Sequence, residues 1–518
     1  MAATTAPAPA SLRSAASQSL AALAVFLINM TTGLSVGWSS PGWSKLTEPD
    51  AAGPGFVLDL DEASWVVAIY DVGIPVGSVL AGVLLGSCGR RGTLMLAPLL
   101  VLASSALTAA ARSSAALLAA RVLVGVSFGL DLSCSSLYLG EIASRDMRGK
   151  LCTFTTSCVF VGVLVEYCVG PYVSFFAQAL LPVPFALLSL LLLVFWAPES
   201  PYFLATRGRA EDMRRALARM RGLPAGRDPR APQDPRVAAA RAAVDREAED
   251  ILRAMEAERW RGRALWRTLL SSAGSRRGCL IVLFLCGTGP MVGTGSVVSY
   301  AQYLFRTTGT SLSAEMSAIV MCSVQVVAGL ASSQVIDRAG RRPLLLVTAL
   351  CNTCAMAAAG AFFFLRDALG DADAAARVTW LPLVSLMAFM VSTNLGTTTV
   401  PWVMIGELLP QQAKTFVPSL SVLGFSVVAF GTNKLFPVLG ERVGLFLPFW
   451  IFGIWSVIVF VFTLFVVPET RGKSLLEVQA LLEGGGGEPA KPLDTAPAVL
   501  DSEEWDDADG AGQARERW

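Results

Sequence analysis

The chain has 518 residues, of which 53% are apolar and 16% charged, and its mean hydropathy is +0.56. Average globular domains carry about 25% charged residues, so this composition predicts a membrane protein. The formal net charge of +1 gives no overall attraction for nucleic acid, and the chain's lack of histidine excludes histidine-based catalysis, Ser-His-Asp triads and histidine metal sites. We therefore expect neither an enzyme nor a bound metal or cofactor.

Twelve apolar runs are long enough to span a bilayer, whose hydrocarbon core of ~30 Å needs about 20 helical residues. They lie near 18–40, 63–87, 93–111, 115–140, 149–171 and 175–197, and then near 278–303, 312–336, 343–365, 378–408, 415–440 and 445–467. The pattern predicts an all-α membrane protein with twelve transmembrane helices in two six-helix bundles, over 18–197 and 278–467. Tails at 1–17 and 468–518 flank them, and we expect the acidic end of the second tail to be disordered.

The segment between the bundles, 198–277, has a different composition. From Arg207 to Arg277 it holds 18 Arg against 10 acids, and residues 237–260 have the pattern of a charged amphipathic helix. Short loops at 88–92, 145–150 and 337–342 are also basic, whereas the opposite loops are neutral or acidic. By the positive-inside rule, we expect a multi-pass protein of the cell membrane with both termini and the central segment in the cytoplasm.

Three charged signatures occur once in each half, after the matching spans. They are Gly89-Arg-Arg and Gly340-Arg-Arg, Glu141-x6-Arg148 and Glu407-x6-Lys414, and Pro198-Glu-Ser and Pro468-Glu-Thr. Basic anchors alone would explain the arginines but not the acids paired with them. The three repeats in register predict two homologous bundles, an architecture that transporters use around a mid-membrane site.

The three paired signatures occur together with Arg121-x3-Gly125, Tyr138-Leu-Gly-Glu141, Asp337-Arg-Ala-Gly-Arg-Arg342 and Pro401-Trp402-x4-Glu407. These motifs carry a resemblance of residues 20–480 to the sugar-porter family of the major facilitator superfamily. Gly37-Trp-Ser-Ser-Pro41 and Ser299-Tyr-Ala-Gln302 most resemble arthropod facilitated trehalose transporters. The resemblance implies the major facilitator fold and facilitated diffusion of a sugar-like solute by alternating access. The implied partners are a small-molecule substrate and the lipid bilayer; the oligomeric state is left open.

The chain departs from the family at the positions that bind sugar. The helix 5 glutamine falls on Thr156, the amide-rich helix 7 signature falls on 289–295, and the helix 11 asparagine falls in 424–430, which contains none. We expect the remaining polar and aromatic groups to line the mid-membrane site: Thr156, Met291, Thr294, Gln325, Asn394 and Trp402. The loss of amides leaves two alternatives open, a transporter of another solute such as an organic ion, and a non-transporting sugar sensor.

Opposite charges at helix ends are expected to form a cytoplasmic gate between the bundles. The predicted gating charges are Arg90, Arg91, Glu141 and Arg148 in the first half, and Asp337, Arg341, Arg342, Glu407 and Lys414 in the second. We expect Glu199 and Glu469 to cap or pair with these clusters.

Three acids lie within predicted spans, where charged residues are costly and usually functional or paired. We expect Asp71 or Glu166 to form an ion pair with Arg121, and Asp131, nearer the middle, to be the acid that meets the substrate. A static charged rim and a proton or cation site are both open interpretations. Ser39 lies where proton-coupled relatives carry Asp, which favours uniport.

Overall fold

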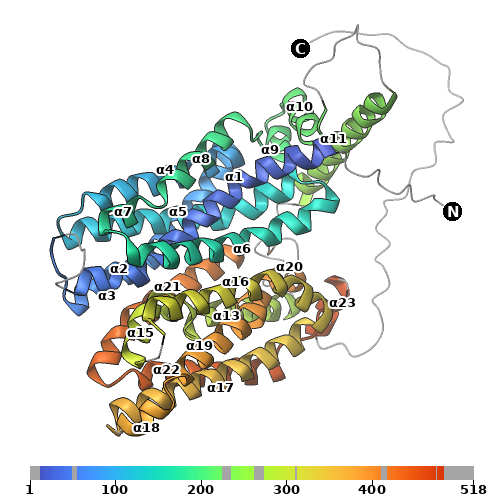
Figure 1. The fold of residues 1–518 in the computed structure, drawn as a ribbon. Coiled ribbons are helices and arrows are strands. Elements are labelled where there is room, and N and C mark those ends of the chain that lie inside the picture. Colours follow the sequence, from blue (N-terminus) through green and yellow to red (C-terminus); the bar gives the residue numbers. More distant parts are fainter. Residues whose placement is uncertain are drawn as a thin grey trace, which may run out of the picture.

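The computed structural model describes residues 12–48, 55–223, 235–261, 273–309, 312–370, 372–409, 413, 417–473 and 475–483. Every regular element in these ranges is helical. Twelve of the described segments are long and apolar enough to cross a membrane, from Ser14–Thr47 to Phe446–Phe465. The predicted twelve spans are therefore confirmed, and Figure 1 shows them as two stacks, blue to green and yellow to red.

The first stack, here called the N-bundle, contains the first six spans. Its elements are α1 (Leu12–Gly37), α2 (Ser39–Thr47), α3 (Leu60–Ser87), α4 (Gly89–Ala109), α5 (Ser114–Ile142), α6 (Arg145–Val169), η1 (Gly170–Tyr172), α7 (Phe175–Leu180) and α8 (Val183–Phe195). Glycines let its helices pack backbone to backbone, as small residues do in membranes. On α3 and α5, a Cβ at Gly77 would overlap the carbonyl of Val126, and one at Gly129 would overlap that of Ile74.

The second stack, the C-bundle, contains the other six spans. Its elements are α13 (Ala273–Met291), α14 (Thr294–Ser299), α15 (Ala301–Thr308), α16 (Ala314–Ala339), α17 (Arg341–Asp367), α18 (Ala372–Arg377), α19 (Leu381–Ser392), the π-helical turn η3 (Thr393–Thr397), α20 (Thr399–Leu408), α21 (Val417–Arg442) and α22 (Phe446–Phe465). Aromatic rings fill much of its core; Phe363 stacks on Phe449 and Phe436 stacks on Phe452.

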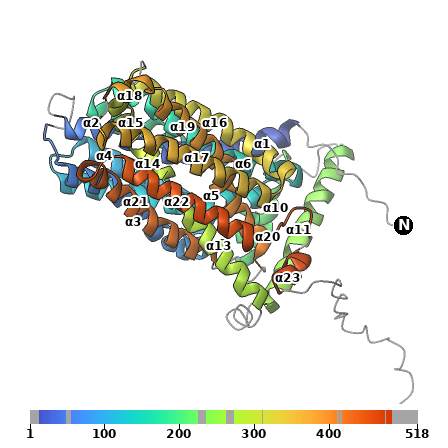
Figure 2. The same cartoon turned by 90° about the horizontal axis from the view of Figure 1, so that it is seen from below.

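Four helices outside the spans gather at one end of the molecule. They are α9 (Pro201–Thr206), α10 (Ala210–Met220) and α11 (Pro235–Arg261), here called the lid, and α23 (Leu475–Glu483). Figures 1 and 2 both show α11 and α23 at this end, which we call the lid side, and α2, α15 and α18 at the opposite end, which we call the seal side. The helix predicted over 237–260 is confirmed as α11.

The lid is attached to the N-bundle. Its own core includes Leu217, Val244 and Ile251. The hydroxyl of Ser14 donates to the carbonyl of Met220 at 3.2 Å, and hydrogen bonds from Arg219 and Arg221 reach the carbonyls of Phe195 and Ile142 at 3.1 and 3.3 Å. In contrast, α23 packs against α13 and α20 of the C-bundle.

Candidate transport site

Among the predicted substrate residues, Trp402 packs against a cluster that residues of both bundles form. It is half-buried on α20, and the buried cluster is formed by Tyr70 and Ile74 of α3, Val124 of α5 and Val422 of α21. An aromatic ring at this junction has a face suited to packing against the C–H groups of a solute.

Two more predicted residues hold polar atoms without partners. Gln325 on α16 is 2% exposed, and within the described part of the chain its Oε1 has no hydrogen-bond partner; the Oγ1 of Thr294, at the start of α14, is likewise buried without one. Leaving such an atom buried and unpaired costs about 1–3 kcal/mol, a cost that a bound hydroxyl-bearing solute would remove.

The other three predicted substrate residues are less clearly placed for binding. Asn394 lies in the π-turn η3, a feature that is frequent at functional sites, but its Nδ2 donates to the Met390 carbonyl at 2.7 Å. Thr156 is exposed on α6, and Met291 is half-buried at the end of α13. Among the described residues, no hydrogen bond joins the six predicted side chains to one another.

The prediction that Arg121 forms an ion pair with Asp71 or Glu166 is wrong. Within the described ranges Arg121 contacts no carboxylate; its guanidinium donates to the Ser35 carbonyl and the Ser39 hydroxyl, both at 2.8 Å. It also lies over the rings of Trp38 and Tyr70, with its central carbon at 5.0 and 5.1 Å from the ring centroids. Carbonyls and aromatic faces accommodate this buried cation in place of a counter-ion.

Asp71 instead joins the two bundles. Its Oδ2 accepts a hydrogen bond from Asn433 Nδ2 of α21 at 2.7 Å, and Asn433 Oδ1 accepts one from the Ser296 hydroxyl at 3.0 Å. The Tyr300 hydroxyl donates to the backbone carbonyl of Asn433 at 2.9 Å. The sequence interpretation missed Asn433; the signal was a polar side chain in an apolar run, nine positions beyond Gly424.

Glu166 is held through an amide rather than a cation. Its Oε1 accepts from Gln178 Nε2 at 2.8 Å, and Gln178 Oε1 accepts from Lys45 Nζ, also at 2.8 Å. Lys45 was also missed, because the first span was expected to end near residue 40, whereas α2 extends it to Thr47.

Asp131 is 1% exposed and lies between α1 and α5. It accepts hydrogen bonds from Asn29 Nδ2 at 3.2 Å, from the Thr32 hydroxyl at 3.0 Å and from the Ser135 hydroxyl. All three donors belong to the N-bundle, so the structure accounts for this carboxyl group without a substrate.

Side chains from both bundles close the seal side. Tyr300 packs edge-on against Trp43 with ring centroids 4.9 Å apart, and the Tyr167 hydroxyl donates to the Val298 carbonyl. At the surface, Lys434 Nζ pairs with Asp61 Oδ1 at 2.6 Å. Each of these contacts crosses from one bundle to the other.

The charged clusters on the lid side form their described pairs within one bundle. Arg90 makes a bidentate pair with Glu141, with atoms at 2.9 and 3.0 Å, and Arg341 pairs with Glu407 at 2.8 Å. The repeat seen in the sequence is therefore also present in the structure, where each half forms the equivalent ion pair. Arg148 is exposed and has no ion pair within the described ranges, while Lys414 and the side chain of Asp337 lie outside the described residues.

The expected caps are present in both halves. Glu199 accepts from the backbone amides of Arg90 and Arg91 at 2.9 and 3.0 Å, and Glu469 accepts from those of Arg341 and Arg342, both at 3.1 Å. Each carboxylate thus satisfies two of the open amides at the N-terminus of a helix, α4 or α17, where negative charge is favourable.

This geometry predicts an acid-sensitive contribution to stability. Burial alone would raise the pKa of Glu469, but hydrogen bonds from the amides of Arg471, Arg341, Arg342 and Thr470 lower it below its usual 4.5. A depressed pKa means that the ionised form stabilises the fold fully above the ordinary pKa of 4.5, and that this contribution is lost as the pH falls below it.

Glu469→Gln should therefore lower the unfolding midpoint at pH 7 and flatten its fall between about pH 5 and pH 3. Differential scanning fluorimetry of the purified protein measures both. Glu62→Gln, at the exposed start of α3, is the control and should retain the wild-type profile. A profile of Glu469→Gln that matches wild type would contradict the capping role.

Comparisons with known proteins agree with this architecture. A family model described as "Sugar (and other) transporter" matches residues 13–482. The facilitated trehalose transporter Tret1 of Culex quinquefasciatus is 30% identical over 473 residues, which cover 90% of this chain and 86% of that protein. Tret1 of Polypedilum vanderplanki is 28% identical, with 90% and 88% covered, and the match to Tret1 of Aedes aegypti spans only 55% of that protein.

Solved structures show the same fold. The inward open conformation of the xylose transporter XylE from E. coli gives a TM-score of 0.70 at 19% identity, covering 90% of this chain and 99% of that one. The partially occluded inward open conformation of XylE gives 0.67 at 20% identity, covering 90% and 100%. With a family match over nearly the whole length and two six-helix bundles in the major facilitator fold, the chain belongs to the sugar (and other) transporter family.

Proposed function

We propose that the protein is a facilitative transporter of a sugar or sugar-like solute that works by alternating access. The observation that carries the proposal is the asymmetry between the two ends. On the seal side, Asn433–Asp71, Lys434–Asp61 and Tyr167–Val298 join the bundles, whereas the described lid-side clusters pair within their own bundles. Such an arrangement is expected of a transporter closed at one end, and it agrees with the likeness to inward open XylE.

We propose that the lid side and both termini face the cytoplasm and that the membrane is the plasma membrane. The basic loops at Arg90–Arg91 and Arg341–Arg342 lie on the lid side, which supports this orientation by the positive-inside rule. In the state that closes the lid side, we propose that the nine predicted charges, from Arg90 to Lys414, act as the inner gate.

We propose trehalose as the first substrate to test. It is the sugar named for the Tret1 relatives compared above, and a site with few amides is better suited to a large solute with an extended contact face than to a small hexose. Trp402 supplies an aromatic face between the bundles, and Gln325 and Thr294 supply unpaired polar atoms.

Uptake of labelled trehalose into proteoliposomes tests the proposal, with glucose and an organic cation run in parallel. Wild type should equilibrate trehalose without accumulating it, and a protonophore should leave the rate unchanged in both wild type and Asp131→Asn. Accumulation that collapses with the protonophore, and is lost in Asp131→Asn, would refute uniport. If none of these solutes shows counterflow, the result would favour the alternative of a non-transporting sugar sensor, which the loss of the family's amides also supports.

Trp402→Ala should raise the KM for trehalose by about two- to twelvefold, because an aromatic contact is worth about 0.5–1.5 kcal/mol. Trp380→Ala is the matched control, since Trp380 is 57% exposed at the start of α19 on the seal side. The assignment of Trp402 would be wrong if both variants kept the wild-type KM.

A further inference from the structure

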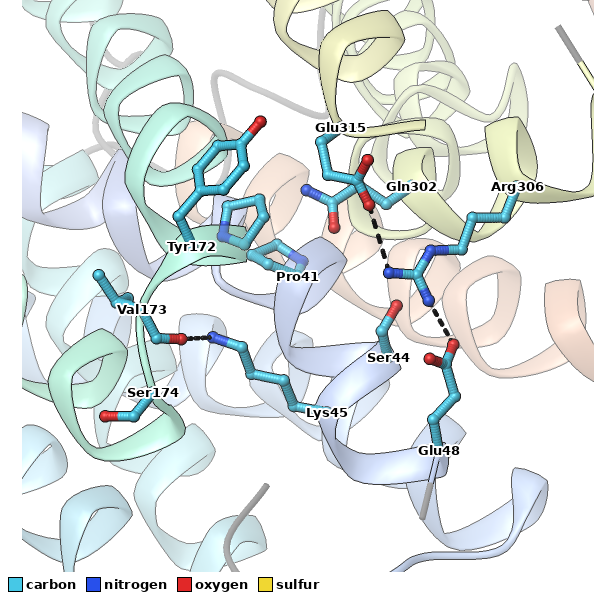
Figure 3. Close-up of a pocket in the computed structure, with 11 residues that line it drawn as sticks. Pro41, Ser44, Lys45, Glu48, Tyr172, Val173, Ser174, Gln302, Arg306 and Glu315 are labelled. Carbon is cyan, nitrogen blue, oxygen red and sulfur yellow. Dashed lines mark hydrogen bonds and ion pairs between the residues drawn. The ribbon is translucent and has the colours of Figure 1, made fainter. Parts of the chain in front are cut away.

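A cavity that is separate from the proposed mid-membrane site lies between the bundles on the seal side. Its volume is about 480 Å³, within the range of small-molecule sites. Figure 3 shows residues from both bundles around it. The N-bundle contributes Pro41, Ser44, Lys45, Glu48 and Pro171–Ser174, and the C-bundle contributes Gln302, Arg306 and Glu315.

The side chains that line this cavity carry equal numbers of positive and negative charges. Lys45 Nζ donates to the carbonyls of Gly170 and Val173 at 2.6 and 2.7 Å and to Gln178 Oε1 at 2.8 Å, which uses all three of its N–H groups. Arg306 pairs with Glu48 across the bundles and with Glu315 at 3.3 Å. Two cations and two anions leave no net charge to attract an ion, so the wall favours a neutral ligand.

Two further features point to the chemistry of that ligand. Gln302 is 1% exposed, and its Nε2 is buried with no hydrogen-bond partner among the described residues, so the wall holds an N–H donor that a ligand's acceptor could satisfy. Tyr172 is 67% exposed beside Pro41, and its ring gives the rim an apolar face. Hydroxyl groups both accept and donate hydrogen bonds, and the C–H face of a sugar ring packs on an aromatic ring.

We propose that this cavity is a second binding site, for a neutral polyhydroxylated solute such as a mono- or disaccharide. Because its walls come from both bundles, the site exists only while the seal side is closed. A ligand bound there stabilises that state and slows uptake from the seal side, since a ligand that binds one of two states shifts the population towards it. The choice of a sugar as probe rests on the proposed function.

Protection of an introduced cysteine tests the site without measuring transport. Ser174→Cys places a thiol on the exposed rim, and its labelling by a maleimide is followed in lipid nanodiscs as trehalose is added. Ser113→Cys is the matched control, because both serines are exposed N-caps, of α7 and α5, and Ser113 does not line the cavity. Wild type gives the background from the native cysteines.

Trehalose should slow the labelling of Ser174→Cys in a saturable manner and leave Ser113→Cys unaffected. In the Ser174→Cys protein, a further Tyr172→Ala substitution should raise the trehalose concentration that gives half-protection at least tenfold. Tyr172→Phe, which keeps the ring, should leave that concentration unchanged. Protection should persist in Trp402→Ala, which alters the mid-membrane site.

Absent or equal protection at the two cysteines would overturn the proposal, as would protection that is lost with Trp402→Ala but not with Tyr172→Ala. Uptake into proteoliposomes is measured on the same protein. Protection without uptake supports the second site and refutes trehalose transport; uptake without protection refutes the second site alone.

Discussion

A valine at Gly129 should prevent the N-bundle from assembling. A Cβ at this position overlaps the carbonyl of Ile74 on α3, and Gly77 stands in the same relation to Val126 on α5. The two backbones are in direct contact, so a side chain forces α3 and α5 apart along their length. We expect destabilisation of about 3–5 kcal/mol, at the upper end of single substitutions.

Size-exclusion chromatography and the thermal midpoint of the purified protein measure this effect. Gly129→Val should lose the monodisperse peak or lower the midpoint by many degrees. Gly82→Val, on the partner helix α3, is the control, because a Cβ at Gly82 meets no described atom within 4 Å. A wild-type yield and midpoint for Gly129→Val would show that the helices pack differently.

The second large effect is expected at Asn433. Asn433→Leu removes the hydrogen bond to Asp71 across the bundles, together with the one from Ser296. A buried hydrogen bond to a carboxyl group is worth about 1–3 kcal/mol, so the ratio of closed to open seal should fall by about 5- to 150-fold.

Hydrogen–deuterium exchange with mass spectrometry should detect this shift as faster exchange in α2, α14 and α15, which line the seal side. Thr432→Val is the matched control: among the described residues the Thr432 hydroxyl donates only to Ala429 O of its own helix, so exchange should stay at the wild-type rate. Equal exchange in the two variants would show that Asn433 does not hold the seal.

The fold could be predicted from the sequence because few backbone structures can cross a bilayer with all their hydrogen bonds satisfied. Hydropathy located all twelve spans, and the paired signatures around Arg90 and Arg341 identified the repeat that the ion pairs to Glu141 and Glu407 now display. Glu199 and Glu469 were placed correctly because the acid of each repeat lies next to the basic start of a helix in its own half.

The contacts inside the membrane were harder to predict, because they depend on how helices rotate and where they break. Arg121 was expected beside a carboxylate on grounds of depth alone, yet it faces carbonyls and rings. Lys45 was missed because the first span continues beyond Trp38 as α2, up to Thr47. Asn433 was missed because its partner lies 362 positions away, a separation that no local pattern encodes.

The attachment of the lid gives each half of the molecule its own labelling position outside the membrane. Hydrogen bonds from Arg219 and Arg221 fix the lid to the N-bundle, while Arg277 and α23 belong to the C-bundle, where Arg277 donates to the Leu482 carbonyl at 2.9 Å. Fluorophores on the exposed faces of α11 and α23 would each travel with one half of the protein. Energy transfer between them would then follow single transport cycles without a dye inside the membrane.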